Sequence, residues 1–335
     1  MGGRLNAEGE ERNQRPQRET AGFFSSSRVF TQPVGLHLRP GELAGYYIDL
    51  RLKAEVPRWP PDWLECPEME PFISTAQWGL GAYERYLAGE GEVWCAAAVE
   101  AAMHLVRRQE KHGPRAGAWI HQYALDHTYD VGDRWISAMA QGEAASLLVR
   151  AHAVTGEDHF AEATRLALRP LGIAQSAGGV RAKLGSGFFL EEYPTDPPSH
   201  VLNGGIFALW GYHDVALGLG DADARREFEE GIDTLARNIQ RWDTGAWTRY
   251  DLFPFRVTNL ASSFYHLLHI DQLRAMQLIA PKPEFEAAVE RFERYRASRA
   301  LRTRAFAQKA FFRTLVPRNR LLGRRTPFRR PRRLR

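Results

Sequence analysis

The stretch from residue 188 to residue 214 concentrates reactive side chains. Glu191, Glu192 and Tyr193 stand together directly before Pro194. Proline biases the preceding residue toward extended geometry, so we expect a short strand that enters a loop, the usual place for reactive groups. A neutral tyrosine, with a reference pKa of about 10, is a poor base but a good proton donor. A solvated strand end followed by a capped helix explains the composition equally well.

The elements that must position this stretch are predicted to be mainly helical. Apolar residues at helical spacing and glycine stops mark about eight helices, which pair as four antiparallel hairpins. They cover residues 72–88, 93–111, 135–155, 158–171, 203–217, 222–242, 259–279 and 283–300. Short strands are expected in 118–133, in a β-hairpin over 178–193 and at 247–252. Helical hairpins that wind around an axis form an (α/α) toroid, and an irregular helical bundle is the structural alternative.

Composition places the chain among soluble globular proteins. It has 335 residues, of which 44% are apolar. No apolar run reaches the roughly 18 residues that a membrane span needs. The N-terminus is polar and lacks the apolar core of a signal peptide, and the two cysteines, Cys66 and Cys95, make no disulfide framework. We therefore predict a cytoplasmic protein.

The basic charge of the chain comes from its C-terminal end. Residues 313–335 contain ten arginines and no acid, and removing these charges from the net charge of +5 leaves −5 for residues 1–312. Such a block is usually disordered. It could bind an acidic glycan, a membrane surface or nucleic acid by electrostatics, and a plain solvated tail is at least as good an interpretation.

Motifs for cofactor and metal chemistry are missing from the sequence. Gly185-Ser186-Gly187 lacks the third glycine and the following helix of a dinucleotide site. The sequence has no P-loop, no His-Glu-x-x-His and no paired cysteine motif. His121 and His127 flank one loop, but two histidines do not make a metal site. We therefore predict neither a metal nor an organic cofactor.

Several short segments carry a family resemblance through their order and spacing. They are WISAMAQG at 135–142, LVRA at 148–151, GV at 179–180, EEYPT at 191–195, VLNG at 201–204, WDTG at 242–245, YDL at 250–252, YH at 265–266 and HIDQL at 269–273. Together they resemble the C-terminal catalytic domain of D-glucuronyl C5-epimerases, which convert glucuronate to iduronate within heparan-type chains. The resemblance covers about residues 73–296, is strongest over 135–273, and implies an incomplete (α/α) barrel.

The chemistry of that family asks for particular groups. Removing the C5 proton beside a carboxylate places a second negative charge on the carboxylate carbon, so donors and acceptors are needed on both faces of the ring. By resemblance, Tyr193 and Tyr265 are the proton carriers, Glu192 is an assisting carboxylate and Tyr250 is a third aromatic at the site. In a regular strand Glu191 would share a face with Tyr193, so a role for Glu192 requires an irregular turn before Pro194.

A further set of residues consists of candidates for substrate binding. They are Gln141, Glu191, Asn203, Arg249, Arg256 and His269. Asn203 could bond a sugar hydroxyl or simply cap a helix, and Gln141 is structural in the first place. Animal members carry an arginine directly after the Tyr-Asp-Leu motif, where this chain has Phe253, so Arg249 or Arg256 could bind the carboxylate instead.

The predicted helix at 259–279 has two faces. Tyr265, His269 and Gln272 lie at i, i+4 and i+7 on one face, which is expected to point into a cleft. Phe264 and Leu267, together with Leu260, form the face that is expected to be buried.

These inferences give one leading function with two alternatives. We predict an isomerase that inverts C5 of glucuronate in a heparosan- or heparan-like polysaccharide. A polysaccharide lyase and a non-catalytic protein that binds acidic glycans are the alternatives. The expected organisation is a disordered segment 1–30, an (α/α) catalytic domain 31–300 and an arginine-rich tail 301–335. The expected partner is an acidic polysaccharide and not nucleic acid, with weak membrane-surface contact through the tail and a homodimer left open.

Overall fold

The computed structural model describes residues 31–61, 70–126 and 128–317, and these residues are mainly helical. The α-helices of the described residues are α1 (Phe72–Leu87), α2 (Glu92–Arg108), α3 (Ala138–Thr155), α4 (Asp158–Gly172), α5 (Leu202–Leu219), α6 (Ala222–Asn238), α7 (Ser263–Ile279), α8 (Pro283–Ala297) and α9 (Arg299–Leu315). Short 3₁₀ turns lie at Arg51–Lys53, Gln175–Ala177 and Ile239–Trp242.

Six short strands form three antiparallel pairs beside the helices. They are β1 (Ile120–His121) with β4 (Trp135–Ile136), β2 (Leu125–Asp126) with β3 (Asp130–Val131), and β5 (Arg181–Leu184) with β6 (Gly187–Leu190). The last pair is the hairpin predicted for residues 178–193. It turns at Gly185, whose φ of 59° suits glycine.

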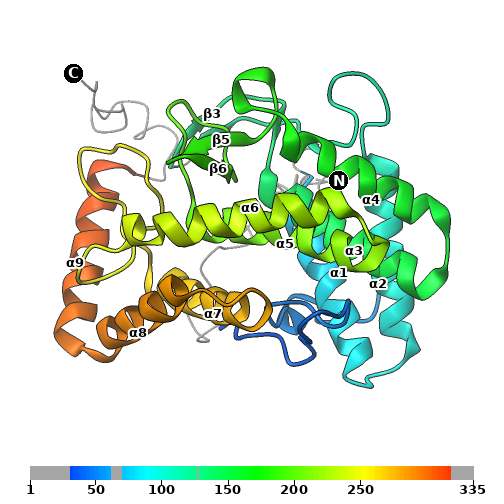
Figure 1. The fold of residues 1–335 in the computed structure, drawn as a ribbon, viewed down its shortest axis with the longest axis horizontal. Coiled ribbons are helices and arrows are strands. Elements are labelled where there is room, and N and C mark those ends of the chain that lie inside the picture. The colour runs from blue at the N-terminus through cyan, green and yellow to red at the C-terminus, as the bar shows by residue number, and fades with distance from the viewer. Residues whose placement is uncertain (1–30, 62–69, 127, 318–335) are drawn as a thin grey trace, which may run out of the picture. The chain divides into compact units, whose positions relative to one another are not determined.

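The helices pack as consecutive hairpins (Figure 1). Helices α1, α3, α5 and α7 contact one another in that order, and each also packs against the helix that follows it in sequence. The first helices of the hairpins therefore form an inner layer, and α2, α4, α6 and α8 form an outer one. This arrangement confirms the predicted incomplete (α/α) toroid of four helical hairpins.

Two glycines allow the inner helices α3 and α5 to touch. A Cβ atom on Gly142 would lie 2.5 Å from the Cα of Ala208, and one on Gly211 would lie 2.5 Å from the Cα of Gly142. The same helix pair carries a buried ion pair in which Nη1 of Arg150 donates to Oδ2 of Asp214 at 2.6 Å. These two glycines therefore let the backbones of α3 and α5 pack closely.

Helix boundaries differ from the prediction where polar side chains cap the helices. Trp135 and Ile136 belong to strand β4, and α3 begins after Ser137, whose hydroxyl accepts from the Ala140 amide at 3.4 Å. Likewise, α7 begins after Ser262, whose hydroxyl accepts from the Tyr265 amide at 3.3 Å. An N-cap serine satisfies amides that the first helical turn leaves unpaired.

Helix α9 lies beside α8 and was not predicted (Figure 1). Its residues Ala305 and Phe312 are buried, as is Val316 directly after it. The predicted boundary between residues 300 and 301 therefore falls inside a packed helix. The segments 1–30 and 318–335 lie outside the described residues. Within the described ranges, no helix combines the length and apolarity needed to cross a bilayer.

Candidate functional site

Four tyrosines from separate parts of the chain gather in what we call the tyrosine cluster. Tyr129 stands just before β3, Tyr193 follows β6, Tyr250 belongs to an extended segment, and Tyr265 is in the first turn of α7. The rings of Tyr129 and Tyr193 lie 5.1 Å apart, and those of Tyr250 and Tyr265 lie 4.8 Å apart. Hydrogen bonding between Tyr193 and Tyr250 joins the two pairs.

Glu192 lies against this cluster as a buried carboxyl group. Strand β6 ends at Leu190, and Glu192 and Tyr193 form a bend, which is the irregular turn that a role for Glu192 requires. The Oε2 atom of Glu192 has no hydrogen-bond partner among the described residues. Burial, opposed by hydrogen bonding to Tyr193, raises the pKa of Glu192 to about 7. Both its protonated and ionised forms are therefore populated near neutral pH.

Gly204 makes room for this carboxyl group at the start of α5. A Cβ atom at position 204 would lie 2.3 Å from Oε2 of Glu192 and 2.5 Å from its Cβ. Any larger residue would have to displace Glu192 or the first turn of the helix. The glycine after Asn203 is therefore explained by the packing of Glu192.

The hydroxyl groups of Tyr129, Tyr193 and Tyr250 are neutral at physiological pH. Burial, followed by the negative charge of Glu192, raises the pKa of Tyr193 and that of Tyr250 well above the ordinary value. Hydrogen bonding to Tyr250 partly opposes this shift at Tyr193. Neutral phenols donate protons, and Glu192 is the acidic group beside them whose pKa suits the acceptance of one.

A buried network of hydrogen bonds contacts the tyrosine cluster through Tyr129. Oδ2 of Asp251 accepts from the Tyr129 hydroxyl and from Nδ2 of Asn259, both at 2.5 Å. Nζ of Lys309 donates to Oδ1 of Asn259 and to the Leu260 carbonyl, both at 2.6 Å. Burial raises the pKa of Asp251 to about 6, and the hydrogen bonds from Tyr129 and Asn259 oppose this shift. Neither Tyr129 nor Lys309 was predicted from the sequence, and Asp251 of the Tyr-Asp-Leu motif was the available signal for the network.

Two of the predicted binding residues hold parts of the protein's own backbone. Oε2 of Glu191 accepts from the Ser199 amide, the Ser199 hydroxyl and the His200 amide at 3.1, 2.9 and 2.8 Å. Gln141 accepts from the Trp119 amide and donates to two backbone carbonyls, each at 2.9 Å. Glu191 thus fixes the loop before α5, and Gln141 fixes the loop before β1.

Asn203 is not the helix cap that the sequence suggested. The N-cap of α5 is Val201, and Asn203 lies inside the first turn. Its Oδ1 atom is buried without a hydrogen-bond partner among the described residues. Its backbone carbonyl accepts from Nε2 of Gln272 on α7 at 3.1 Å. The Asn203 side chain therefore remains a candidate for contact with a substrate.

The faces of α7 are reversed relative to the prediction. His269 and Gln272 on the polar face are buried, whereas Phe264 and Leu267 are half-buried. The reason is that α7 is an inner helix, whose polar face meets α5 and Thr248. Nδ1 of His269 lies 3.1 Å from the Thr248 hydroxyl. Burial and the neighbouring His266 lower the pKa of His269 to about 3, so it is a neutral ring.

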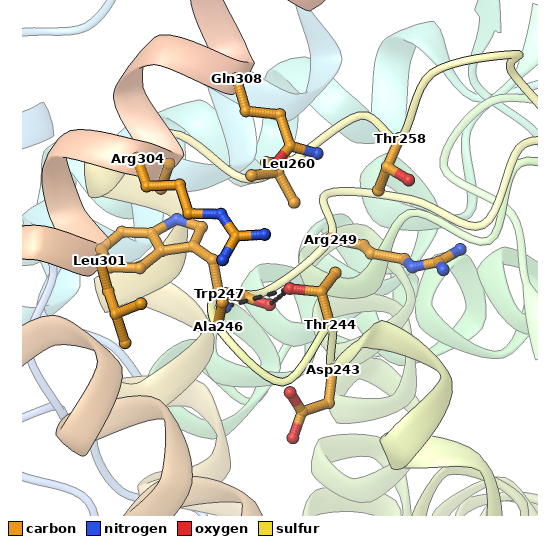
Figure 2. Close-up of a pocket in the computed structure, with 11 residues that line it drawn as sticks. Asp243, Thr244, Ala246, Trp247, Arg249, Thr258, Leu260, Leu301, Arg304 and Gln308 are labelled. Atoms are coloured by element: carbon orange, nitrogen blue, oxygen red, sulfur yellow. Dashed lines mark hydrogen bonds between the residues drawn. The ribbon is translucent and has the colours of Figure 1, made fainter.

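The two arginines predicted to bind the carboxylate, Arg249 and Arg256, do not belong to the tyrosine cluster. Thr248 contacts His269 and Tyr250 contacts Tyr265, whereas Arg249 between them lines a different pocket (Figure 2). Arg256 is exposed. A cation that does approach the cluster is Lys309, whose Nζ lies 5.6 Å from the ring centre of Tyr250. No group of three or more metal-binding side chains was found in the described ranges.

Comparison with known proteins identifies relatives of this chain. Residues 112–294, more than half of the chain, match the family model described as D-glucuronyl C5-epimerase C-terminus. A D-glucuronyl C5-epimerase of Caenorhabditis elegans is 34% identical over 155 residues, which are 42% of this chain and 25% of that protein. An uncharacterized protein of Methanocaldococcus jannaschii is 26% identical over 154 residues, covering 45% and 48%. The matches thus span less than half of either relative.

Solved structures with a similar helical arrangement are more distant. The unsaturated glucuronyl hydrolase of Bacillus sp. GL1 superposes with a TM-score of 0.41 and 16% identity, covering 68% of this chain and 62% of that one. A polysaccharide lyase superposes with a TM-score of 0.43 and 15% identity, covering 67% and 57%. Neither likeness bears on the function.

Proposed function

Because this chain belongs to the D-glucuronyl C5-epimerase C-terminal family, we propose that it inverts C5 of D-glucuronate to L-iduronate within a heparosan-like polysaccharide. The observation that carries the proposal is the meeting of Glu192, Tyr193, Tyr250 and Tyr265 in one cluster. Each lies within a motif of the family resemblance, and the three motifs come from separate parts of the chain. The cytoplasmic location and the homodimer stay predictions.

The proposed reaction is a balanced exchange of protons. One group removes the C5 proton, and the electron pair left at C5 spreads into the adjacent carboxylate. A second group then returns a proton to the opposite face of C5, which inverts the centre without loss of any atom. No electron acceptor is needed, because nothing is oxidised or reduced overall.

Tyr193 and Tyr265 take opposite faces of the sugar in this scheme. Ionised Glu192 accepts the phenolic proton of Tyr193 as Tyr193 removes the C5 proton, which avoids an isolated phenolate. Tyr250 donates a hydrogen bond to Tyr193 and so stabilises the negative charge that develops there. Tyr265, on α7, supplies the proton for the other face, after which solvent returns a proton to the Tyr265 oxygen and takes one from Glu192.

Isotope exchange tests this proposal directly. The chain is incubated with heparosan in deuterium oxide, and NMR is used to look for deuterium at C5 together with iduronate signals. Formation of a C4–C5 double bond, detected by its ultraviolet absorbance, would instead identify a lyase. Binding of heparosan with neither exchange nor a double bond would identify a glycan-binding protein and contradict the proposal.

A further inference from the structure

An open pocket of about 330 Å³ lies between the turn at residues 243–249 and helix α9 (Figure 2). Its lining includes Trp247 and Leu260 as apolar surfaces and Thr258 and Gln308 as polar ones. The Trp247 indole is held in place, since its Nε1 donates to the Ala261 carbonyl at 3.0 Å and its ring stacks on His266 at 3.7 Å. The Trp247 side chain is only 2% exposed, so its indole packs the wall of the pocket, and the polar side chains are the surface open to a ligand.

The pocket also carries unbalanced positive charge. Arg249 and Arg304 both line it, and Figure 2 shows Arg304 reaching from α9 toward the segment that contains Arg249. The Nε atom of Arg249 is buried and has no hydrogen-bond partner in the described part of the chain. Asp243 is the carboxylate of the lining, and it already accepts from Nε of Arg291 at 2.8 Å. Figure 2 shows the Arg249 side chain pointing away from Arg304, so the exposed guanidinium of Arg304 is the group available to bind an anion, a task that suits its forked geometry.

The pocket and the tyrosine cluster are linked through neighbouring residues. Arg249 directly precedes Tyr250 in sequence. Leu260, which lines the pocket, accepts through its carbonyl from Lys309, whose Nζ lies 5.6 Å from the ring centre of Tyr250. Arg304 and Lys309 both belong to α9, which has five basic residues and no acidic one. Helix α9 follows residue 294, where the family match ends.

We propose that this pocket binds a second acidic sugar of the same polysaccharide chain whose uronate reacts at the tyrosine cluster. Arg304 holds its carboxylate, and the polar side chains of Thr258 and Gln308 face its hydroxyl groups. The inference rests on the proposed function, which it extends from one reacting residue to the chain that carries it. It makes α9 a part of substrate recognition and not only a part of the packing.

The test compares two variants that remove the same charge from the same helix. Arg304→Gln removes a guanidinium from the pocket. Arg299→Gln removes an exposed one that does not line it. Calorimetry measures binding of non-sulfated heparosan fragments to the full chain, with one fragment long enough to reach both sites and one too short. We expect Arg304→Gln to weaken binding of the long fragment by about three- to tenfold, as for one charge-assisted hydrogen bond near the surface. Binding of the short fragment and the effect of Arg299→Gln should be within error of wild type.

The possible outcomes separate the pocket from the reaction. Equal effects of the two variants, no effect of Arg304→Gln, or no binding of heparosan by the wild type would each overturn the pocket proposal. C5 exchange that persists while Arg304→Gln changes nothing would leave the epimerase standing without the pocket. A selective loss in Arg304→Gln with no C5 exchange in the wild type would leave the pocket standing without the epimerase.

A parallel series with sulfated fragments identifies the acidic group that is bound. If Arg304→Gln weakens binding of sulfated and non-sulfated fragments by the same factor, the shared carboxylate is the group that the pocket holds. A loss seen with sulfated fragments alone would overturn the assignment to a carboxylate.

Discussion

Glu192 and Tyr193 are neighbours in sequence that divide the work of one proton transfer. Burial raises the pKa of both, but only the carboxyl group comes close to neutral pH, at about 7. The phenol alone would be a weak base, and the carboxylate alone would lie on a bend whose position depends on Gly204. In the proposed reaction, Glu192 therefore supplies a pKa close to neutral, and Tyr193 supplies the contact with the C5 proton.

Phenylalanine substitutions test the two proton carriers. Tyr193→Phe and Tyr265→Phe each keep the ring but remove the transferable proton. We expect each to lower the rate of inversion by at least ~100-fold, the lower range for general acid–base catalysis, with little loss of stability. The NMR exchange assay measures the rate, and Tyr86→Phe, a half-buried tyrosine outside the cluster, is the control.

The same variants distinguish the two faces of the sugar. In a two-base scheme one of them should still exchange deuterium into one epimer without inverting it. Near-normal inversion in both variants would refute the assignment and make Glu192 with Tyr250 the next pair to test.

The raised pKa of Glu192 predicts opposite pH trends for activity and stability. Activity should rise as pH rises through about 7, because the ionised carboxylate accepts the proton. A buried carboxyl group whose pKa is raised from 4.5 holds its proton longer in the folded chain than in the unfolded one. Its contribution to the free energy of unfolding is therefore present below pH 4.5 and lost as pH rises through about 7.

Glu192→Gln should flatten both trends over that window. Rate and denaturant profiles for wild type and variant provide the comparison, and the difference between them removes the parallel contribution of Asp251. A variant whose activity still rises through the same pH range would show that another group titrates.

At the level of elements, the first turn of α5 is predicted to be intolerant of a single methyl group. Gly204→Ala would place a Cβ 2.3 Å from Oε2 of Glu192, so either the carboxyl group or the helix must shift. We expect a loss of about 1–3 kcal/mol in the free energy of unfolding and a marked loss of inversion. Thermal melts and the exchange assay measure the two effects.

Gly172→Ala is the matched control for that substitution. Gly172 is the last residue of α4, and a Cβ atom there would meet nothing within 4 Å. It should be neutral or slightly stabilising, since alanine favours a helix more than glycine does. Equal behaviour of the two variants would mean that Glu192 does not depend on Gly204.

The sequence predicted the helices well because their pairing repeats along the chain, and it predicted contacts between elements less well. Helical periodicity identifies two faces on α7, but it does not show which face meets α5. For this reason the polar His269 and Gln272 are buried where Phe264 and Leu267 were expected to be. Similarly, motifs led to Tyr193, Tyr250 and Tyr265, whereas Tyr129 and Lys309 reach the cluster only through tertiary packing.

At the scale of the whole molecule, the basic C-terminal end contains a packed helix, α9, as well as a block of arginines. Residues 313–335 stood out as a block of ten arginines, and charge counting cannot show where such a block stops packing. The apolar side chains give a better criterion, because Phe312 and Val316 are buried while Phe306 is 74% exposed. The folded unit therefore extends past residue 300 through α9, and the described part ends at residue 317.

Two truncations test that division. Removing residues 318–335 should shift the melting temperature by no more than a few degrees, spare turnover at saturating substrate and flatten the salt dependence of glycan binding, since it removes charge and keeps the buried Phe312 and Val316. Removing residues 299–335 also takes away Phe312, Lys309 and Arg304. Full burial of one phenylalanine contributes about 1.5–3 kcal/mol, so this longer truncation should destabilise the fold. It should also abolish inversion, because Lys309 no longer holds Asn259 behind the tyrosine cluster.

If the shorter truncation collapses turnover while binding holds, the arginine tail itself belongs to the site. If the longer one retains full stability and activity, α9 is an accessory helix and its basic residues have no part in the reaction.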